Sequence, residues 1–281
     1  MHELQDRVVF VSGAGSGIGA ALAHEVAGRG AKVAVTDVRA DAARAVAEEI
    51  ADGGGTALAL ELDVTSAESW QLAVDRAEEH LGPIALLCSN AGVGPTPSPV
   101  LDLPADYMRW MFEVNYFGGF HGAQCVAPRM RDRGEGHLLF TASVAGFTAG
   151  GQQLGYTTSK HMLVLLAEAL HSELEPAGVG VTILCPAAVA TGLSESTHDR
   201  IPEAFANVMT GTHFSLLDPA LAEQLAAVGG VLAPAVVAHR AIDGVVNGAL
   251  YVFTHPESRA MTLARTDAVE QVFDRMDATS A

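Results

Sequence analysis

The chain has 281 residues, 49% of them hydrophobic, and carries 16 Lys and Arg against 33 Asp and Glu, which gives a net charge of −17. A chain of this length and apolar content can bury one large core, so we expect a single domain, 1–281. A strongly acidic surface repels phosphate backbones and anionic lipids, which argues against nucleic-acid and membrane-binding functions.

The sequence favours a cytoplasmic protein. Met1-His2-Glu3 is not a basic leader, and no apolar run approaches the roughly eighteen residues that a membrane span needs. Cys88, Cys125 and Cys185 form no Cys-x-x-Cys pair, so we expect small buried side chains in a reducing compartment. The histidines form no cluster with carboxylates or cysteines, and no metal site is expected.

Apolar strands alternate with helical segments along the chain. The predicted strands are 7–11, 32–36, 56–62, 84–89, 137–142, 179–185 and 249–253, and the predicted helices are 18–28, 40–52, 65–81, 104–133 and 155–174. Thr65 and Glu68 are expected to form the capping box of the third helix. Irregular turns are expected near Asn115 and Gly118-Gly119 in the fourth.

The first strands are apolar throughout, which is typical of a parallel sheet covered by helices on both faces. Strands joined by helices need right-handed crossovers. The pattern therefore predicts a doubly wound parallel α/β sheet of about seven strands in the order 3-2-1-4-5-6-7. Its ligand crevice is expected at the carboxyl ends of the strands.

A glycine-rich turn follows the first strand. The sequence Ser12-Gly13-Ala14-Gly15-Ser16-Gly17-Ile18-Gly19 leads directly into a helix. Glycines let a pyrophosphate approach the backbone, and the helix N-terminus offers free N–H groups and a positive dipole end. Strand, glycine turn and helix in this order predict a dinucleotide-binding site.

The second strand ends at Asp37, twenty residues beyond Gly17. A carboxylate at this point can accept hydrogen bonds from both hydroxyls of an adenosine ribose, which favours NAD. Arg39 lies close enough in sequence to raise the possibility of NADP.

Tyr156 and Lys160 stand four residues apart in a predicted helix, so their side chains share one face. Free tyrosine has a pKa near ~10 and is a poor base at neutral pH, and a nearby cation lowers that pKa. The pair therefore suggests a proton donor or acceptor that works near pH 7. Ser143 stands thirteen residues upstream of Tyr156.

The glycine spacing, Asn90-Ala91-Gly92, Asn115, Ser143 and the Tyr156–Lys160 pair, in this order, resemble the short-chain dehydrogenase/reductase family. The resemblance runs from about Asp6 to Thr191. It implies a Rossmann-type fold and an NAD-dependent oxidoreductase. The implied catalytic residues are Asn115, which would hold a proton-relay water, Ser143, Tyr156 as general acid/base, and Lys160.

The cofactor residues implied by motif and position extend over much of the crevice. They are Gly13, Gly15, Ser16, Gly17, Ile18, Gly19, Asp37, Val38, Asp63, Val64, Asn90, Ala91, Gly92, Tyr156, Lys160, Pro186, Ala188, Val189 and Thr191. The family often has Pro-Gly after the sixth strand. Here Ala187 follows Pro186, so either its φ is negative or the turn is strained.

The substrate is expected to be a hydrophobic secondary alcohol or ketone, of aryl, alicyclic or terpenoid type. Residues 192–232 carry an apolar helical face and are expected either to form a lid over the site or to be an ordinary pair of surface helices. The predicted substrate residues are Ser143, Ala145, Phe147, Leu154, Tyr156, Phe205, Val208 and Met209, with Pro95 and Pro97 beside them.

Two alternative functions remain open at this stage. One is an NADP-dependent reductase of 3-oxoacyl-carrier-protein substrates, against which Asp37 and the charge of −17 argue. The other is a non-catalytic NAD-binding protein. The complete set of Ser143, Tyr156 and Lys160 argues against it, because a binding protein does not need a tyrosine with a shifted pKa. The helices of 104–133 and 155–174 carry more apolar residues than one face against the sheet requires, so a homodimer or homotetramer is expected.

Overall fold

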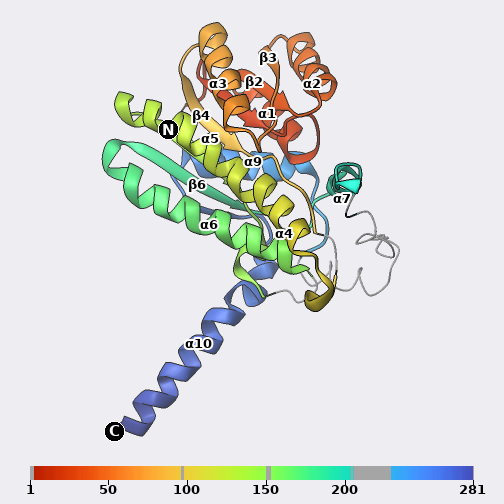
Figure 1. Cartoon of the computed structure of the whole chain (residues 1–281). Helices are drawn as coiled ribbons and strands as arrows, with labels where there is room; N and C mark the ends of the chain where they lie inside the picture. Colours follow the sequence, from red (N-terminus) through yellow and green to blue (C-terminus); the bar gives the residue numbers. More distant parts are fainter. Residues whose placement is uncertain (1–2, 96–97, 150–152, 204, 206–228, 281) are drawn as a thin grey trace.

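A computed structural model of the chain describes residues 3–95, 98–149, 153–203, 205 and 229–280. Seven parallel strands form one sheet in the order β3-β2-β1-β4-β5-β6-β7, which confirms the predicted topology (Figure 1). The strands are β1 (Val8–Ser12), β2 (Lys32–Asp37), β3 (Thr56–Glu61), β4 (Ile84–Ser89), β5 (Gly136–Thr141), β6 (Val179–Cys185) and β7 (Tyr251–Phe253).

Helices cover both faces of the sheet because the strands are apolar on both sides. The longer helices are α1 (Gly17–Gly28), α2 (Ala40–Asp52), α3 (Ala67–Leu81), α4 (Ala105–Phe112), α5 (Gly118–Arg133), α6 (Leu154–Leu174), α9 (Pro234–Val246) and α10 (Arg259–Ser280). Helices α3, α5 and α6 share one buried apolar cluster with the sheet. Helices α1, α2 and α9 share the cluster on the other face.

Trp70 of α3 anchors the first of these clusters. It is 1% exposed and its ring stacks on Phe10 of β1 with 5.5 Å between ring centroids. Gly122 lets α5 approach closely, since a Cβ there would lie 2.7 Å from the Trp70 ring. Large-to-small packing of this kind fixes the distance between the two helices.

Two local predictions need correction, and one helix was not predicted. The third helix is capped by Ser66, whose hydroxyl accepts a hydrogen bond from the Ser69 amide, while Thr65 bonds to Asp63 instead. Strand β7 is two residues shorter at its start than expected, because residues 248 and 249 complete the turn after α9. Helix α10 was not predicted at all, and it projects away from the rest of the chain (Figure 1).

The irregular turns predicted near Asn115 are confirmed as a π-helical segment, η2 (Glu113–Phe117), between α4 and α5. π-Helical turns widen a helix locally and are frequent at functional sites. This one carries Asn115 inward, where its side chain is 2% exposed.

His137 of β5 gives the fold a sensitivity to acid. The ring is 2% exposed, its Nε2 lies 2.8 Å from the Thr182 hydroxyl, and burial lowers its pKa to about 3. The unfolded chain binds a proton here near pH 6.5, so the stabilisation is complete above pH 6.5 and is lost as pH falls toward 3.

At pH 5 this residue alone is expected to lower the free energy of unfolding by about 2 kcal/mol relative to pH 7.5. Urea unfolding of His137→Gln should show a smaller difference between the two pH values than wild type does. His80→Gln, at an exposed position, is the control. An unchanged pH difference in His137→Gln would contradict the assignment.

Candidate active site

Tyr156 and Lys160 lie on the first turns of α6. Lys160 is 4% exposed, its Nζ donates to the Thr141 carbonyl at 2.9 Å, and the same nitrogen lies 5.7 Å from the centroid of the Tyr156 ring. Burial lowers the pKa of Lys160 to about 8. The ammonium is thus fixed by a β5 carbonyl at a distance from which it can stabilise a phenolate.

The pKa of Tyr156 does not follow the simple expectation. Burial raises it above its usual value, and a side-chain hydrogen bond with Ser143 works in the opposite direction. Desolvation outweighs the effect of Ser143, and the depression of the pKa expected from Lys160 is not found in the protein alone. The phenol is protonated at neutral pH, in the form that donates a proton.

Ser143 stands at the end of β5 with its side chain beside the phenol. Its hydroxyl donates to the Pro186 carbonyl at 3.2 Å and accepts from the Ala145 amide at 3.1 Å. These bonds tie the serine to the carboxyl ends of β5 and β6, so its position depends on the sheet and not on a mobile loop.

Asn115 is fully engaged by protein groups. Its Oδ1 accepts from the Val93 amide at 2.8 Å, and its Nδ2 donates to the Val93 carbonyl at 3.1 Å and to the Ser159 hydroxyl at 3.0 Å. The side chain thus joins the segment after β4 to α6, next to Lys160. The role predicted for it with a relay water stays a prediction.

The glycine turn has the backbone that its sequence requires. Gly13 and Gly17 have φ of +64° and +58°, which side chains rarely tolerate. A Cβ on Gly19 would lie 2.1 Å from the Gly13 carbonyl oxygen. Asn90 donates to the Ser12 and Gly13 carbonyls at 3.1 and 3.3 Å, which holds the turn against the end of β4.

Asp37 is 3% exposed, and its carboxylate accepts from the Gly15 amide at 3.1 Å and the Arg39 amide at 3.0 Å. Arg200 reaches it from the segment after α7 (Leu193–His198), with Nη2 3.4 Å from Oδ1. Arg39 Nε lies 3.9 Å from the same oxygen. The sequence reasoning missed Arg200, which is 163 residues away from Asp37.

A pocket of about 370 Å³ opens at these strand ends. It is lined by Gly13, Asp37, Val38, Leu62, Asp63, Val64, Thr65, Ala91, Gly92, Val93, Trp110, Val114 and Arg200. Many of these are predicted cofactor residues, whereas Leu62, Thr65, Val93, Trp110, Val114 and Arg200 are additions. A Cβ on Gly92 would lie 3.6 Å from the Lys160 Nζ, so the wall of the pocket at Gly92 lies next to this catalytic candidate.

The segment after β6 passes the pocket without backbone strain. Asp6 is the only non-glycine residue of the described part of the chain with positive φ, so Ala187 has negative φ and the missing glycine introduces no strain. Ala188 and Ala190 exchange backbone hydrogen bonds with Leu232. A Cβ on Gly17 would lie 3.3 Å from Thr191, so this segment reaches the N-terminus of α1.

The predicted substrate residues fall into separate groups. Phe205 joins Tyr156 and Val93 in one apolar cluster, with its ring 6.1 Å from that of Tyr107. Phe147 packs against Phe253 and Tyr251 of β7 at 5.3 and 6.0 Å. Leu154 begins α6, and Ala145 donates its amide to Ser143.

Val208, Met209 and Pro97 lie outside the described residues, as does much of 192–232. The described start of that segment is tied to the site, because the Thr197 hydroxyl accepts from the Gly94 amide at 2.7 Å.

Ser143, Tyr156 and Lys160 close to a pocket at the carboxyl ends of parallel strands are typical of an oxidoreductase of the dinucleotide-binding α/β class. Residues 7–202 match the protein-family model described as short chain dehydrogenase. The chain belongs to the short-chain dehydrogenase/reductase family.

Relatives agree with this assignment. The chain is 39% identical over 193 residues to 1-deoxy-11-beta-hydroxypentalenate dehydrogenase of Streptomyces exfoliatus, covering 68% of this chain and 70% of the relative. It is 35% identical over 193 residues to 7alpha-hydroxysteroid dehydrogenase of Escherichia coli, with 69% and 75% covered. A crystal structure of a short chain dehydrogenase/reductase from Burkholderia phymatum in complex with NAD is 32% identical, with a TM-score of 0.84 and 96% of each chain covered.

No helix in the described part of the chain is long and apolar enough to span a membrane. The described residues also hold no group of three or more His, Cys, Asp or Glu side chains that could bind a metal ion.

Proposed function

We propose that the protein is an NAD-dependent oxidoreductase that interconverts hydrophobic secondary alcohols and their ketones. The observation that supports this most is the meeting of Ser143, Tyr156 and Lys160 beside a pocket whose other end carries the Asp37 carboxylate. The NAD bound by the Burkholderia phymatum relative, which aligns over nearly the whole chain, supports the choice of cofactor.

The residues present fit a dinucleotide. Asp37 offers a buried carboxylate at the pocket wall for ribose hydroxyls, and the glycine turn brings the N-terminus of α1 to the pocket edge for phosphates. When bound, NAD would supply the carbon centre that accepts or gives the hydride.

The chain's own residues would handle the proton and the oxygen of the substrate. In ketone reduction the Tyr156 phenol donates its proton to the substrate oxygen, and in alcohol oxidation the phenolate takes the hydroxyl proton. Ser143 donates a hydrogen bond to the same oxygen and stabilises the charge that develops on it. The Lys160 ammonium favours the phenolate in either direction.

The substrate class is inferred from the apolar surroundings of Tyr156. Its ring packs in one apolar cluster with Val93, Tyr107, Met111 and Phe205. Relatives named for a hydroxysteroid and a hydroxypentalenate are consistent with a bulky secondary alcohol. Incubating the enzyme with NAD and secondary alcohols of increasing bulk, with NADH absorbance as the readout, tests the proposal. We expect alicyclic or aryl alcohols to be oxidised faster than 2-propanol, and the reverse order would contradict the substrate class.

Phe205 is expected to select substrates by size. Phe205→Ala should change the relative kcat/KM of bulky and small alcohols by about tenfold or more, because apolar pockets discriminate by roughly 1–3 kcal/mol for each methylene. NAD affinity should stay unchanged. Leu72→Ala, on α3 and 59% exposed, is the control. Identical relative rates in Phe205→Ala and wild type would show that Phe205 does not contact the substrate.

We further propose that the protein is a homodimer or homotetramer formed through α4, α5 and α6. Tyr116, Phe117 and Phe120 lie half-buried along this side with their rings in mutual contact, and Leu165 of α6 is 66% exposed. Apolar surface of this kind is typical of homo-oligomer interfaces. Light scattering at micromolar concentration should give two or four chain masses, and a monomer would count against the proposal.

A further inference from the structure

Helix α10 is exposed over almost its full length. It begins at Arg259 beside the buried Ser258, and every residue from Leu263 to Ala278 is exposed. Its 22 residues make a rod of roughly 33 Å. The helix contacts η3 (Val144–Phe147), and Figure 1 shows that it projects away from the rest of the chain. A single helix with so few tertiary contacts is only marginally stable in water, so a packing partner is needed to hold it.

The helix has two chemically different faces. Met261, Ala264, Ala268, Val269, Val272 and Phe273 recur at helical spacing and form an apolar stripe. Val269 is 51% exposed and Phe273 is 60% exposed. The opposite face carries four acidic residues, Asp267, Glu270, Asp274 and Asp277.

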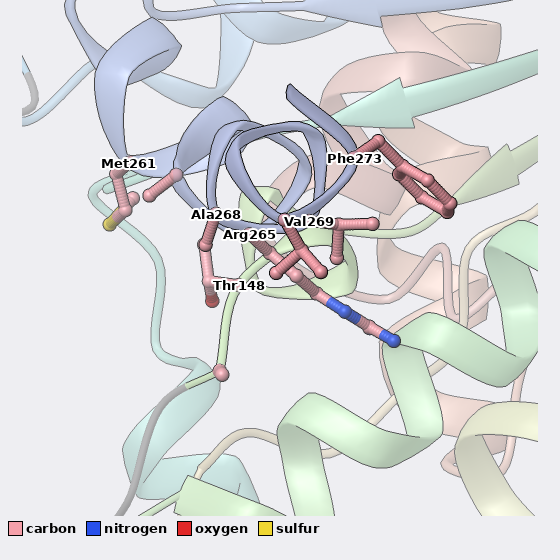
Figure 2. Close-up of a pocket in the computed structure, with 9 residues that line it drawn as sticks. Thr148, Met261, Arg265, Ala268, Val269 and Phe273 are labelled. Atoms are coloured by element: carbon pink, nitrogen blue, oxygen red, sulfur yellow. The ribbon is translucent and has the colours of Figure 1, made fainter. Parts of the chain in front are cut away.

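The apolar stripe, with Arg265 on the same side of the helix, is one wall of an open groove of about 750 Å³ (Figure 2). Thr148 and Ala149, which follow η3, form the other wall. Figure 2 shows Ala268 and Val269 on the side of α10 that faces Thr148. The groove residues on α10 run from Met261 to Phe273 and are centred near Ala268, a small side chain over which two helices can approach closely.

We propose that the groove is occupied by α10 of a second copy of this chain, in an antiparallel pair of helices that cross near Ala268. A two-fold axis at the crossing brings the apolar stripe of one copy into contact with the same stripe of the other copy, as an isologous interface requires. The proposal does not rest on the proposed activity.

The area and the charge both favour a second copy. Two helices of about 33 Å that each cover the other and the adjoining groove wall bury on the order of 1,200–1,600 Å² in total, the range of stable protein interfaces. An anionic membrane surface is a poorer fit, because the four acidic residues would face lipid headgroups, where surface-bound helices carry Lys and Arg.

The pair of α10 helices would form an interface separate from the one proposed through α4, α5 and α6.

The first test changes the stripe and leaves the rest of the chain intact. Val269→Asp with Phe273→Asp should halve the mass found by light scattering and raise the dissociation constant of the affected interface at least 100-fold. Glu270→Ala with Asp274→Ala, on the opposite face, is the matched control and should keep the wild-type mass. All four side chains are exposed, so both variants should fold, and circular dichroism checks this. An unchanged mass in the stripe variant, or the same loss in the control, would overturn the proposal.

The second test locates the crossing. In a Cys125→Ser background, Ala268→Cys should form an intermolecular disulfide under mild oxidation, and Asp274→Cys should not. Equal cross-linking at the two positions, or none at Ala268→Cys, would exclude the antiparallel pair. Sedimentation of wild type with phosphatidylglycerol vesicles, abolished in the stripe variant, would show that lipid is the occupant and overturn the proposal.

Discussion

Tyr156→Phe is expected to lower kcat by roughly 10²–10⁴-fold, the usual contribution of general acid/base catalysis. The substitution removes one oxygen from a half-buried ring and leaves Lys160 and its bond to the Thr141 carbonyl in place. NAD binding should therefore change little. Steady-state kinetics with a bulky secondary alcohol, and titration of NAD by fluorescence, measure the two effects separately.

Tyr251→Phe is the matched control, because it deletes the same atom on β7, where the hydroxyl donates to Glu168 at 2.6 Å. It should keep nearly all activity. If Tyr156→Phe retained more than about a tenth of the wild-type kcat, the phenol would not be the proton donor and acceptor.

Asp37 is expected to give NAD a preference over NADP of roughly 10²-fold in kcat/KM, or about 2.7 kcal/mol. The 2′-phosphate of NADP adds close to two negative charges near the carboxylate. At ~4 Å two unit charges interact by about 4 kcal/mol at an effective dielectric near 20, and Arg39 and Arg200 offset part of this. Asp37→Ser should relax the preference by weakening NAD and admitting NADP.

Asp37→Asn removes the charge and keeps one acceptor oxygen, so it can still accept from one of the Gly15 and Arg39 amides, which bond to different oxygens of Asp37. It should improve kcat/KM for NADP with a smaller loss for NAD than Asp37→Ser. Equal use of both cofactors by wild type would mean that Arg39 and Arg200 determine the cofactor preference at this site, and it would contradict the role given to Asp37.

The sheet could be predicted because its signals are local. A continuous apolar run such as Val8–Val11, followed by a glycine turn, identifies both the strand and the end at which ligands bind. The pairing of Tyr156 with Lys160 needs only the helical period. The strand order follows from right-handed crossovers, which hold for most parallel sheets.

Other features depend on contacts that the sequence does not reveal. Thr65 and Ser66 are both good N-caps, and the choice between them is decided by Asp63, which binds Thr65. Arg200 reaches Asp37 across 163 residues. Burial of Tyr156 raises its pKa, which spacing from Lys160 alone could not indicate. The residues of the α10 stripe recur at helical spacing, but several of them, Val269, Val272 and Phe273 among them, are exposed in the described chain.

Hydride transfer itself tests the account most directly. The enzyme is incubated with NADH deuterated at the transferable position of the nicotinamide and with a bulky ketone, and the product is analysed by mass spectrometry. We predict one deuterium on the carbinol carbon, and far less product over the same time with Tyr156→Phe. Binding of NADH without transfer to any ketone in a panel, and without oxidation of the matching alcohols by NAD, would contradict the account and favour a non-catalytic NAD-binding protein.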